Sequence, residues 1–369
     1  MKRILVKNVS SFFLIRYISS SLLCFLTLFV TGRLGDIDFL LGNIEYGAGG
    51  TTSNFAREIF SNFSFIGNRY LIISLIASIS SLILFILLQS FIDKKNINSW
   101  IFFLMAPGLL IYSNSVTKET LFLYPAIIFI ILECSYLTRK DLKLLNYASN
   151  FFLRIIILGV MIATRGDLSL PYIILFFLNI IIKNVYFGNI FKNLEFNSLL
   201  IKSFFISIIA TFIIIFFKED YFSRTISYLE SSFRYENIFR PSINAQFIRN
   251  PLNYFYIQYL SAFPTPLELI NKPYKMIIII DSLILYFSFI RAWKSLFKVV
   301  NSYTHTRQIT AILFSFVVVI YFSLYGIIGS FNLGSSQRLR INYIPLGIIF
   351  PLILEKMIRE KKLFRKPHL

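Results

Sequence analysis

The chain has 369 residues, of which 56% are apolar, and its mean hydropathy is +0.69. Apolar runs of about 18 residues or more recur from end to end, which excludes an ordinary soluble domain and indicates membrane-spanning helices. The formal net charge of +19 is spread over short segments between these runs, where it sets topology, so no nucleic-acid partner is expected.

About ten apolar segments are predicted to cross the membrane as helices. The first, Phe12–Val30, is too long for a signal-peptide core and lacks an obvious small-residue cleavage site. Lys2, Arg3 and Lys7 precede it, and the tail from Lys356 is basic too, which places both chain ends in the cytoplasm. The predicted spans lie near 12–31, 70–92, 100–113, 120–137, 149–164, 168–182, 199–217, 275–291, 309–328 and 341–357. The expected fold is an all-α polytopic membrane protein, with residues 1–369 forming a single integral membrane domain.

Two long loops are predicted on the outer side of the membrane, at 32–69 and 218–272. The first contains Asp36 and Asp38, which diverge on a helix and face opposite ways on a strand, so no metal pair is expected. One of them could be a general base while the other caps a helix, and a plain solvated loop is the alternative. In the second loop, Pro251–Leu269 is aromatic and apolar and is expected to lie on or dip into the outer leaflet.

Arginine and lysine are divided between the two sides of this predicted topology, because the inner loops are rich in lysine. The outer side holds Arg33, Arg57, Arg69, Arg165, Arg224, Arg234, Arg240, Arg249, Arg338 and Arg340. The positive-inside rule gives no reason for these outer arginines. A phosphate-bearing substrate does, since the guanidinium fork matches phosphate oxygens.

Rare residue types limit the chemistry further. Cys24 and Cys134 both lie in apolar segments, so neither a structural disulfide nor a cysteine metal site is expected. His305 and His368 lie near predicted cytoplasmic ends, which argues against a histidine zinc site or a histidine-activated nucleophile on the outer face. The sequence has no P-loop and no glycine-rich dinucleotide motif, so we expect neither a metal nor a cofactor.

The last outer hairpin carries the strongest signal, because Arg338 and Arg340 open an apolar segment. Burying such charges at a membrane is costly unless an anion or a carboxylate compensates them. We therefore assign both residues to a bound anion. The alternative is a pair of interfacial arginines that cap a span and extend toward the lipid headgroups.

A second signal lies in the hairpin from Pro107 to Glu119. Pro107 is expected to break or tilt the preceding short span and to sink this polar hairpin below the membrane surface. Ser115 or Thr117 could cap the next helix, and Glu119 falls in its first turn, so capping is the competing explanation.

A third signal is the turn at Arg165–Asp167, which joins two short spans. A charged pair near the hydrocarbon is a functional candidate by default, and a self-neutralising turn is the alternative. Two carboxylates within spans, Glu133 and Asp281, are assigned to the inner half of the membrane, as packing or polar-network residues.

In their order along the chain, these elements resemble those of the Wzy-type bacterial polysaccharide repeat-unit polymerases, which make O-antigen or capsule. The matching elements are Gly35-Asp36, the hairpin from Pro107 to Glu119, Arg165-x-Asp167, Phe263-Pro264-x-Pro266, and Asn332 to Pro345 with Arg338-x-Arg340. Gly166 stands where a proline is expected in related chains. The resemblance covers most of the chain.

The resemblance implies a metal-independent glycosyltransferase of the bacterial inner membrane that acts on its periplasmic face. Its substrates would be undecaprenyl-diphosphate-linked glycans, and its partners membrane lipid, a chain-length regulator and a flippase. Arg165, Arg338, Arg340 and Lys118 are assigned to the diphosphates. The general base is assigned to Asp167, then to Asp36 and Glu119.

Two other functions stay open at this point. A lipid-linked glycan flippase would need a charged cavity and two pseudo-symmetric halves. A glycosyltransferase that uses a polyprenyl-phosphate sugar would favour the acidic pair Asp36 and Asp38, often with a metal.

Overall fold

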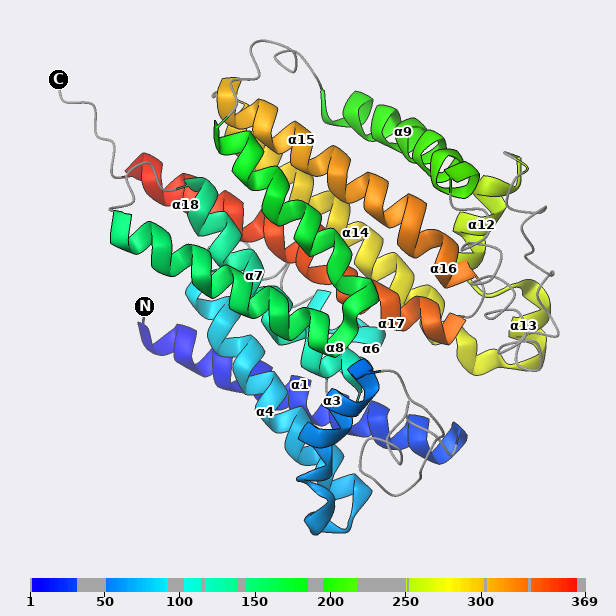
Figure 1. Ribbon diagram of the computed structural model, residues 1–369. Helices are drawn as coiled ribbons and strands as arrows, with labels where there is room; N and C mark the ends of the chain where they lie inside the picture. Colours follow the sequence, from blue (N-terminus) through cyan, green and yellow to red (C-terminus); the bar gives the residue numbers. More distant parts are fainter. Residues whose placement is uncertain are drawn as a thin grey trace. The chain divides into compact units, whose positions relative to one another are not determined.

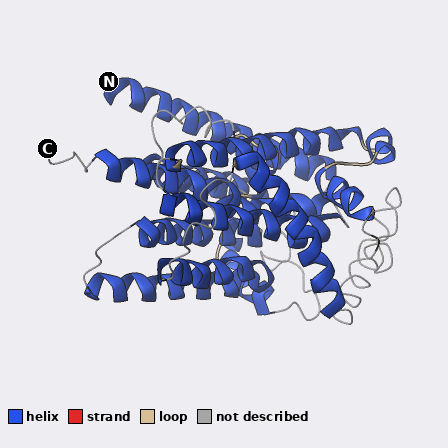
Figure 2. Ribbon diagram, turned by 90° about the horizontal axis from the view of Figure 1, so that it is seen from above, coloured by secondary structure: helices blue, strands red, loops and turns tan. Residues whose placement is uncertain are grey.

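The computed structural model is helical almost throughout the residues it describes (Figures 1 and 2). These residues are 2–31, 51–91, 103–113, 117–138, 144–184, 195–217, 250, 252–301, 304–330 and 333–363. Within them, five helices are long and apolar enough to cross a membrane, or six if one bent helix pair forms a single span. The all-α prediction is confirmed for this part of the chain, and a polytopic membrane protein fits it. The count of ten spans and the orientation stay predictions.

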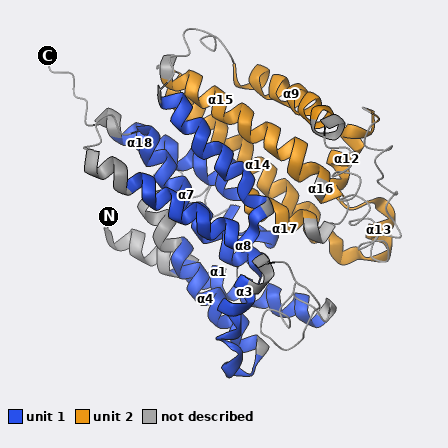
Figure 3. Cartoon of the chain, in the orientation of Figure 1, with its two compact units in different colours: residues 1–185, 344–369 blue, residues 186–343 orange. Residues whose placement is uncertain are grey.

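The chain divides into two compact units (Figure 3). The single integral membrane domain stays a prediction. Unit 1 comprises residues 1–185 and 344–369, and unit 2 comprises residues 186–343. Unit 1 holds α1 Lys2–Thr31, α3 Thr51–Ser61, η1 Ser64–Ile66, α4 Arg69–Phe91, α6 Pro107–Tyr112, α7 Lys118–Thr138, α8 Leu144–Asn184, η5 Pro345–Ile349 and α18 Phe350–Leu363. Unit 2 holds α9 Phe196–Phe217, α12 Asn253–Ala262, α13 Pro266–Asn271, η3 Pro273–Lys275, α14 Met276–Val300, α15 Thr304–Ile320, η4 Tyr321–Tyr325, α16 Gly326–Ser330 and α17 Leu333–Ile344 except its last residue.

In unit 1, α7 packs against α8 and α18, and α1 packs against α4 and α6. An aliphatic and aromatic cluster joins α1, α3, α4 and α6. Its buried members are Cys24, Leu28, Ala56, Phe60, Ile72, Ile73, Ile76 and Ile111. The opposite faces of α1 and α4 expose leucines and isoleucines, such as Leu22 and Leu71. Helices that are apolar on their outer face as well fit a hydrocarbon surrounding.

Two predicted interruptions of helix are present in unit 1. Pro107 is the first residue of α6, and Ala106 before it is extended, so the predicted span 100–113 is broken there. Arg165 has φ −150° and ψ 78° inside α8, which divides this helix at the turn that the sequence predicts between two spans. The predicted loop 32–69 contains α3, which packs against α8.

In unit 2, α15 continues through the π-helical turn η4 into α16, and α12 packs against α16. A π turn leaves helix carbonyls without their usual partners. The Phe322 carbonyl accepts from Gln258 Nε2 at 2.8 Å and from the Tyr254 hydroxyl at 3.4 Å. Burial raises the pKa of Tyr254 to about 12, so the phenol stays a hydrogen-bond donor even in alkaline solution. These contacts fasten α12 to the π turn.

Candidate functional site

Two of the predicted site residues meet in unit 1. Arg165 Nη2 lies 3.4 Å from Glu119 Oε1. The Glu119 side chain is 2% exposed and that of Arg165 is 20% exposed, so the carboxylate is buried and the guanidinium is partly exposed. The contact joins the first turn of α7 to the break in α8.

A side-chain cap by Thr117 explains why α7 begins where it does. Thr117 Oγ1 accepts from the Thr120 amide at 3.3 Å, so the predicted cap by Thr117 is confirmed. A capping box would need an acid at the position of Thr120. Glu119 lies one residue earlier and turns instead to Arg165. Its negative charge also suits the positive end of the helix dipole.

The break in α8 gives Arg165 its direction. Because Arg165 is not helical, its side chain leaves the row of its helical neighbours and reaches α7. Hydroxyl groups on both sides of the break hold nearby carbonyls. Thr164 Oγ1 donates to Met161 O at 2.9 Å, and Ser169 Oγ donates to Gly166 O at 2.7 Å. The break is therefore built into the sequence on both sides of Arg165.

The other predicted residues of this site are only partly visible. Lys118 precedes Glu119 as the first residue of α7 and is half-buried. Asp167 belongs to α8 just after the break, but its side chain lies outside the described residues. Asp36 and Asp38 lie outside them as well. The choice of Asp167 or Asp36 as general base stays a prediction.

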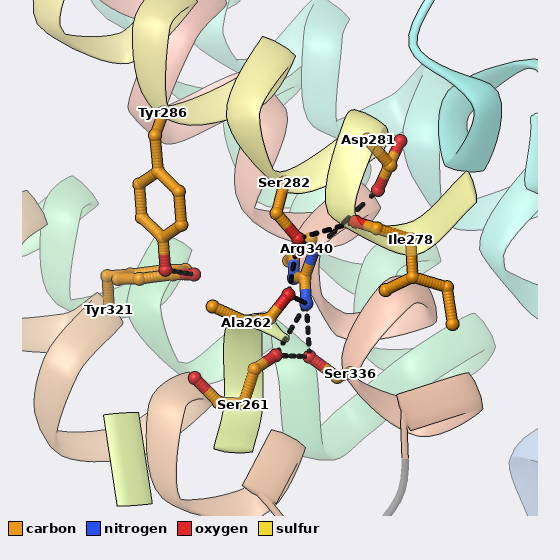
Figure 4. Close-up of polar contacts among 9 residues, drawn as sticks. All are labelled: Ser261, Ala262, Ile278, Asp281, Ser282, Tyr286, Tyr321, Ser336 and Arg340. Carbon is orange, nitrogen blue, oxygen red and sulfur yellow. Dashed lines mark hydrogen bonds and ion pairs between the residues drawn. The ribbon is translucent and has the colours of Figure 1, made fainter. Parts of the chain in front are cut away.

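Arg340 occupies a buried clamp in unit 2 (Figure 4). Its Nη2 donates to Ala262 O at 3.1 Å and Ser336 Oγ at 2.9 Å, and also to Ser261 O. Its Nη1 donates to Ser282 Oγ and lies 3.7 Å from Asp281 Oδ2. Ser261 and Ala262 form the end of α12, where helix carbonyls lack their usual partners. Arg340 thus neutralises the negative end of a helix together with a carboxylate.

This clamp bears on the predicted role of Arg340 in binding a diphosphate. Both terminal nitrogens are engaged by protein acceptors, and a diphosphate would have to displace them. Within the described ranges, only Nε of this guanidinium lacks a hydrogen-bond partner. Arg338 lies on the same helix, α17, and is half-buried, so it is more exposed than Arg340.

The predicted place of Asp281 in the inner half of its span does not fit the predicted topology. It lies in the second turn of α14, close to the end that follows the predicted outer loop. A lone acid in an apolar run gave no signal of its arginine partner, which lies far along the chain. Near the clamp, the hydroxyls of Tyr286 and Tyr321 are 2.7 Å apart (Figure 4).

A second buried ion pair joins α7 to α8 and supports the assignment of Glu133 to a polar network. Arg154 Nε donates to Glu133 Oε1 at 2.5 Å, and Asn179 Nδ2 donates to Glu133 Oε2 at 2.6 Å. The Arg154 guanidinium lies 4.3 Å from the ring centroid of Tyr136. Glu133 lies about 21 Å along α7 from Glu119, at 1.5 Å per residue. This network is therefore remote from the Glu119–Arg165 pair.

The predicted arginines fall into different units, so their common site stays a prediction. Arg165 belongs to unit 1, and Arg338 and Arg340 belong to unit 2. Among the residues whose placement is described, no group of three or more histidine, cysteine or acidic residues could hold a metal ion. Comparisons with models of protein families, with curated proteins and with solved structures gave no match.

Proposed function

We propose that this protein polymerises oligosaccharide repeat units carried on undecaprenyl diphosphate, by glycosyl transfer at the periplasmic face of a bacterial inner membrane. The supports are an order of sequence elements that resembles that of Wzy-type polymerases, and a described part of the chain that is helical with several candidate spans. The observation that carries the proposal is the Glu119–Arg165 contact. It brings together, from separate helices, a carboxylate predicted as a candidate general base and a guanidinium predicted to bind the diphosphate.

The proposed chemistry uses these two residues in turn. The acceptor hydroxyl of a fresh repeat unit attacks the anomeric carbon of the growing chain, and the bond from that carbon to the diphosphate oxygen breaks. Arg165 and Lys118 stabilise the negative charge that grows on the departing lipid diphosphate. A diphosphate that draws Arg165 away frees the Glu119 carboxylate to take the hydroxyl proton. The energy comes from the sugar–diphosphate bond, so the reaction needs no nucleotide.

The test is polymer formation from lipid-linked repeat unit by the purified protein in detergent or vesicles. We expect Arg165→Gln to lower the rate by about 10²–10³-fold, the loss typical of one transition-state donor. Glu119→Gln should lower it by about 10²–10⁴-fold, the range for a general base. Glu360→Gln is the matched control, because Glu360 is 53% exposed in a surface pair with Lys356. Laddered product that persists in both site variants would remove these residues from the mechanism.

A lipid-linked glycan transporter is the second candidate. Arg16, Arg154 and Glu133 are buried in apolar helices, and intramembrane charges commonly mark transport paths. The two functions differ in what a deletion strain accumulates. Single repeat units on the carrier at the outer face support a polymerase, whereas single units retained at the inner face support a transporter.

A further inference from the structure

The short helix α6 ends inside unit 1, and the surrounding side chains bind its last carbonyls. Leu110 O accepts from Ser20 Oγ at 2.7 Å, and Ile111 O accepts from Cys24 Sγ at 3.6 Å. Ser113 O accepts from Ser80 Oγ at 2.6 Å. A helix end that stops away from water needs such donors. Helices α1 and α4 therefore supply a fitted socket for the end of α6.

Arg16 of α1 lies at the centre of this socket. It is 1% exposed, and its Nη1 donates to Ser81 Oγ on α4 at 2.7 Å. Its Nη2 donates to Ser113 Oγ, at the C-terminal end of α6, at 3.0 Å. A cation there interacts favourably with the negative end of the helix dipole. One guanidinium thus ties α1, α4 and the end of α6 together.

The end of α6 is in turn fastened to the start of α7. The Tyr112 carbonyl accepts from Thr117 Oγ1 at 3.2 Å and from Thr120 Oγ1 at 2.8 Å. Thr117 is also the residue that caps α7. Glu119 lies between these two threonines on the same first turn. A displacement of Ser113 would therefore be passed through Tyr112 to the Glu119 carboxylate.

We propose that Arg16 is a positioning residue for the Lys118–Glu119–Arg165 site. By fixing the end of α6, it holds the first turn of α7 in the position where Glu119 contacts Arg165. The guanidinium fork is needed because it reaches two helices at once, which a lysine ammonium on one stem does less well. This inference rests on the proposed function only for the meaning of the site, because the positioning itself is measurable without turnover.

The matched control is the neighbouring residue, Tyr17. Its hydroxyl lies 2.5 Å from Ser74 Oγ, so it also joins α1 to α4. Tyr17→Phe removes that link and keeps every contact of Arg16 with α6. A comparison of Arg16→Gln with Tyr17→Phe therefore separates loosening of the α1–α4 pair from loss of the support under α6.

The experiment measures how fast Lys118→Cys reacts with a membrane-impermeant maleimide. The native thiols are removed by Cys134→Ser and by Cys24→Ser, which keeps a hydroxyl donor near Ile111 O in every chain compared. With Arg16→Gln we expect the reaction to accelerate about tenfold or more. The hydrogen bonds of the charged guanidinium no longer hold the end of α6, so the first turn of α7 opens to the reagent more often. With Arg16→Lys we expect an intermediate rate, and with Tyr17→Phe no change. Equal rates in Arg16→Gln and in its parent would overturn the positioning role.

Polymer yield is measured in the same variants with Lys118 restored. Arg16→Gln should lower it about a hundredfold, since a small misplacement of a catalytic group has effects of that size, and Arg16→Lys should recover part of it. Normal polymer from Arg16→Gln would also overturn the inference. If the parent protein makes no polymer, the proposed function fails, while the maleimide rates still decide the positioning.

Arg16→Gln could fail to accumulate in the membrane, and Ser113→Ala then replaces it. This variant keeps the charge and removes the hydroxyl through which Arg16 holds α6. Ser81→Ala removes only the link to α4. We expect Ser113→Ala to accelerate maleimide labelling more than Ser81→Ala does, and the reverse order would contradict the proposal.

Discussion

At the scale of single residues, the buried charges of this protein lie in bonded sets. Glu133 meets Arg154 and Asn179, and Arg340 meets helix-end carbonyls and Asp281. A buried ion is tolerated when its partners replace the lost water, and removing one partner leaves the other charge uncompensated. The energetic weight of each set is therefore visible only when one member is removed.

Arg340→Gln should lower the free energy of unfolding by about 3–5 kcal/mol, because Asp281 is left buried without its cation. Adding Asp281→Asn should recover part of this loss, since the uncompensated charge is then gone. The measurement is thermal or denaturant unfolding in detergent. Glu360→Gln, in an exposed pair, should change the stability by only about 0–1 kcal/mol. A full loss that persists in the double variant would mean that Asp281 does not depend on Arg340.

At the scale of elements, the sequence predicts the breaks better than it predicts their partners. Pro107 and the short spans around Arg165 predict interruptions of helix from local sequence alone, and both interruptions are present. The pairing of Glu119 with Arg165, the role of Arg16 and the π turn at Tyr321–Tyr325 depend on residues distant in the chain. Periodicity and capping rules act over one or two turns, so they carry no information about such contacts.

Gly326 allows the close approach of α16 to α12. A Cβ at this position would overlap the Gln258 side chain, which holds the π turn through Phe322 O. Gly326→Ala should therefore lower the free energy of unfolding by about 1–3 kcal/mol, the range for overpacking a core. Gly159→Ala is the control, because a Cβ there meets nothing within 4 Å. It should be neutral or slightly stabilising, since alanine favours helix. Unfolding in detergent measures both, and equal effects would contradict the close-approach argument.

At the scale of the whole molecule, the helical architecture of the described residues follows from composition, and the predicted orientation rests on charge. The basic segments at both ends predict a cytoplasmic location for each. The loop 218–272, which contains α12 and α13, is predicted on the opposite side. The assignment of Asp36 and of the arginines between 218 and 249 to that side belongs to the same prediction, and these residues lie outside the described part of the chain.

Accessibility of single cysteines checks this orientation in intact cells. With the native thiols removed, Leu252→Cys should react with an impermeant reagent from outside, since Leu252 is 82% exposed and lies within the predicted outer loop 218–272. Glu360→Cys should react only after the membrane is permeabilised, because the basic tail is predicted to lie inside. Labelling of both from the same side would reverse or break the predicted topology.

The two ion pairs between α7 and α8 have a consequence for the surrounding lipid. Glu119–Arg165 and Glu133–Arg154 fasten the same two helices at points about 21 Å apart along α7, at 1.5 Å per residue. Helices riveted twice cannot slide past one another to suit a thinner or thicker bilayer. Hydrophobic mismatch must then be absorbed by tilt of the pair or by the acyl chains themselves. The spacing of these ion pairs therefore restricts the range of bilayer thickness to which the two helices can adapt.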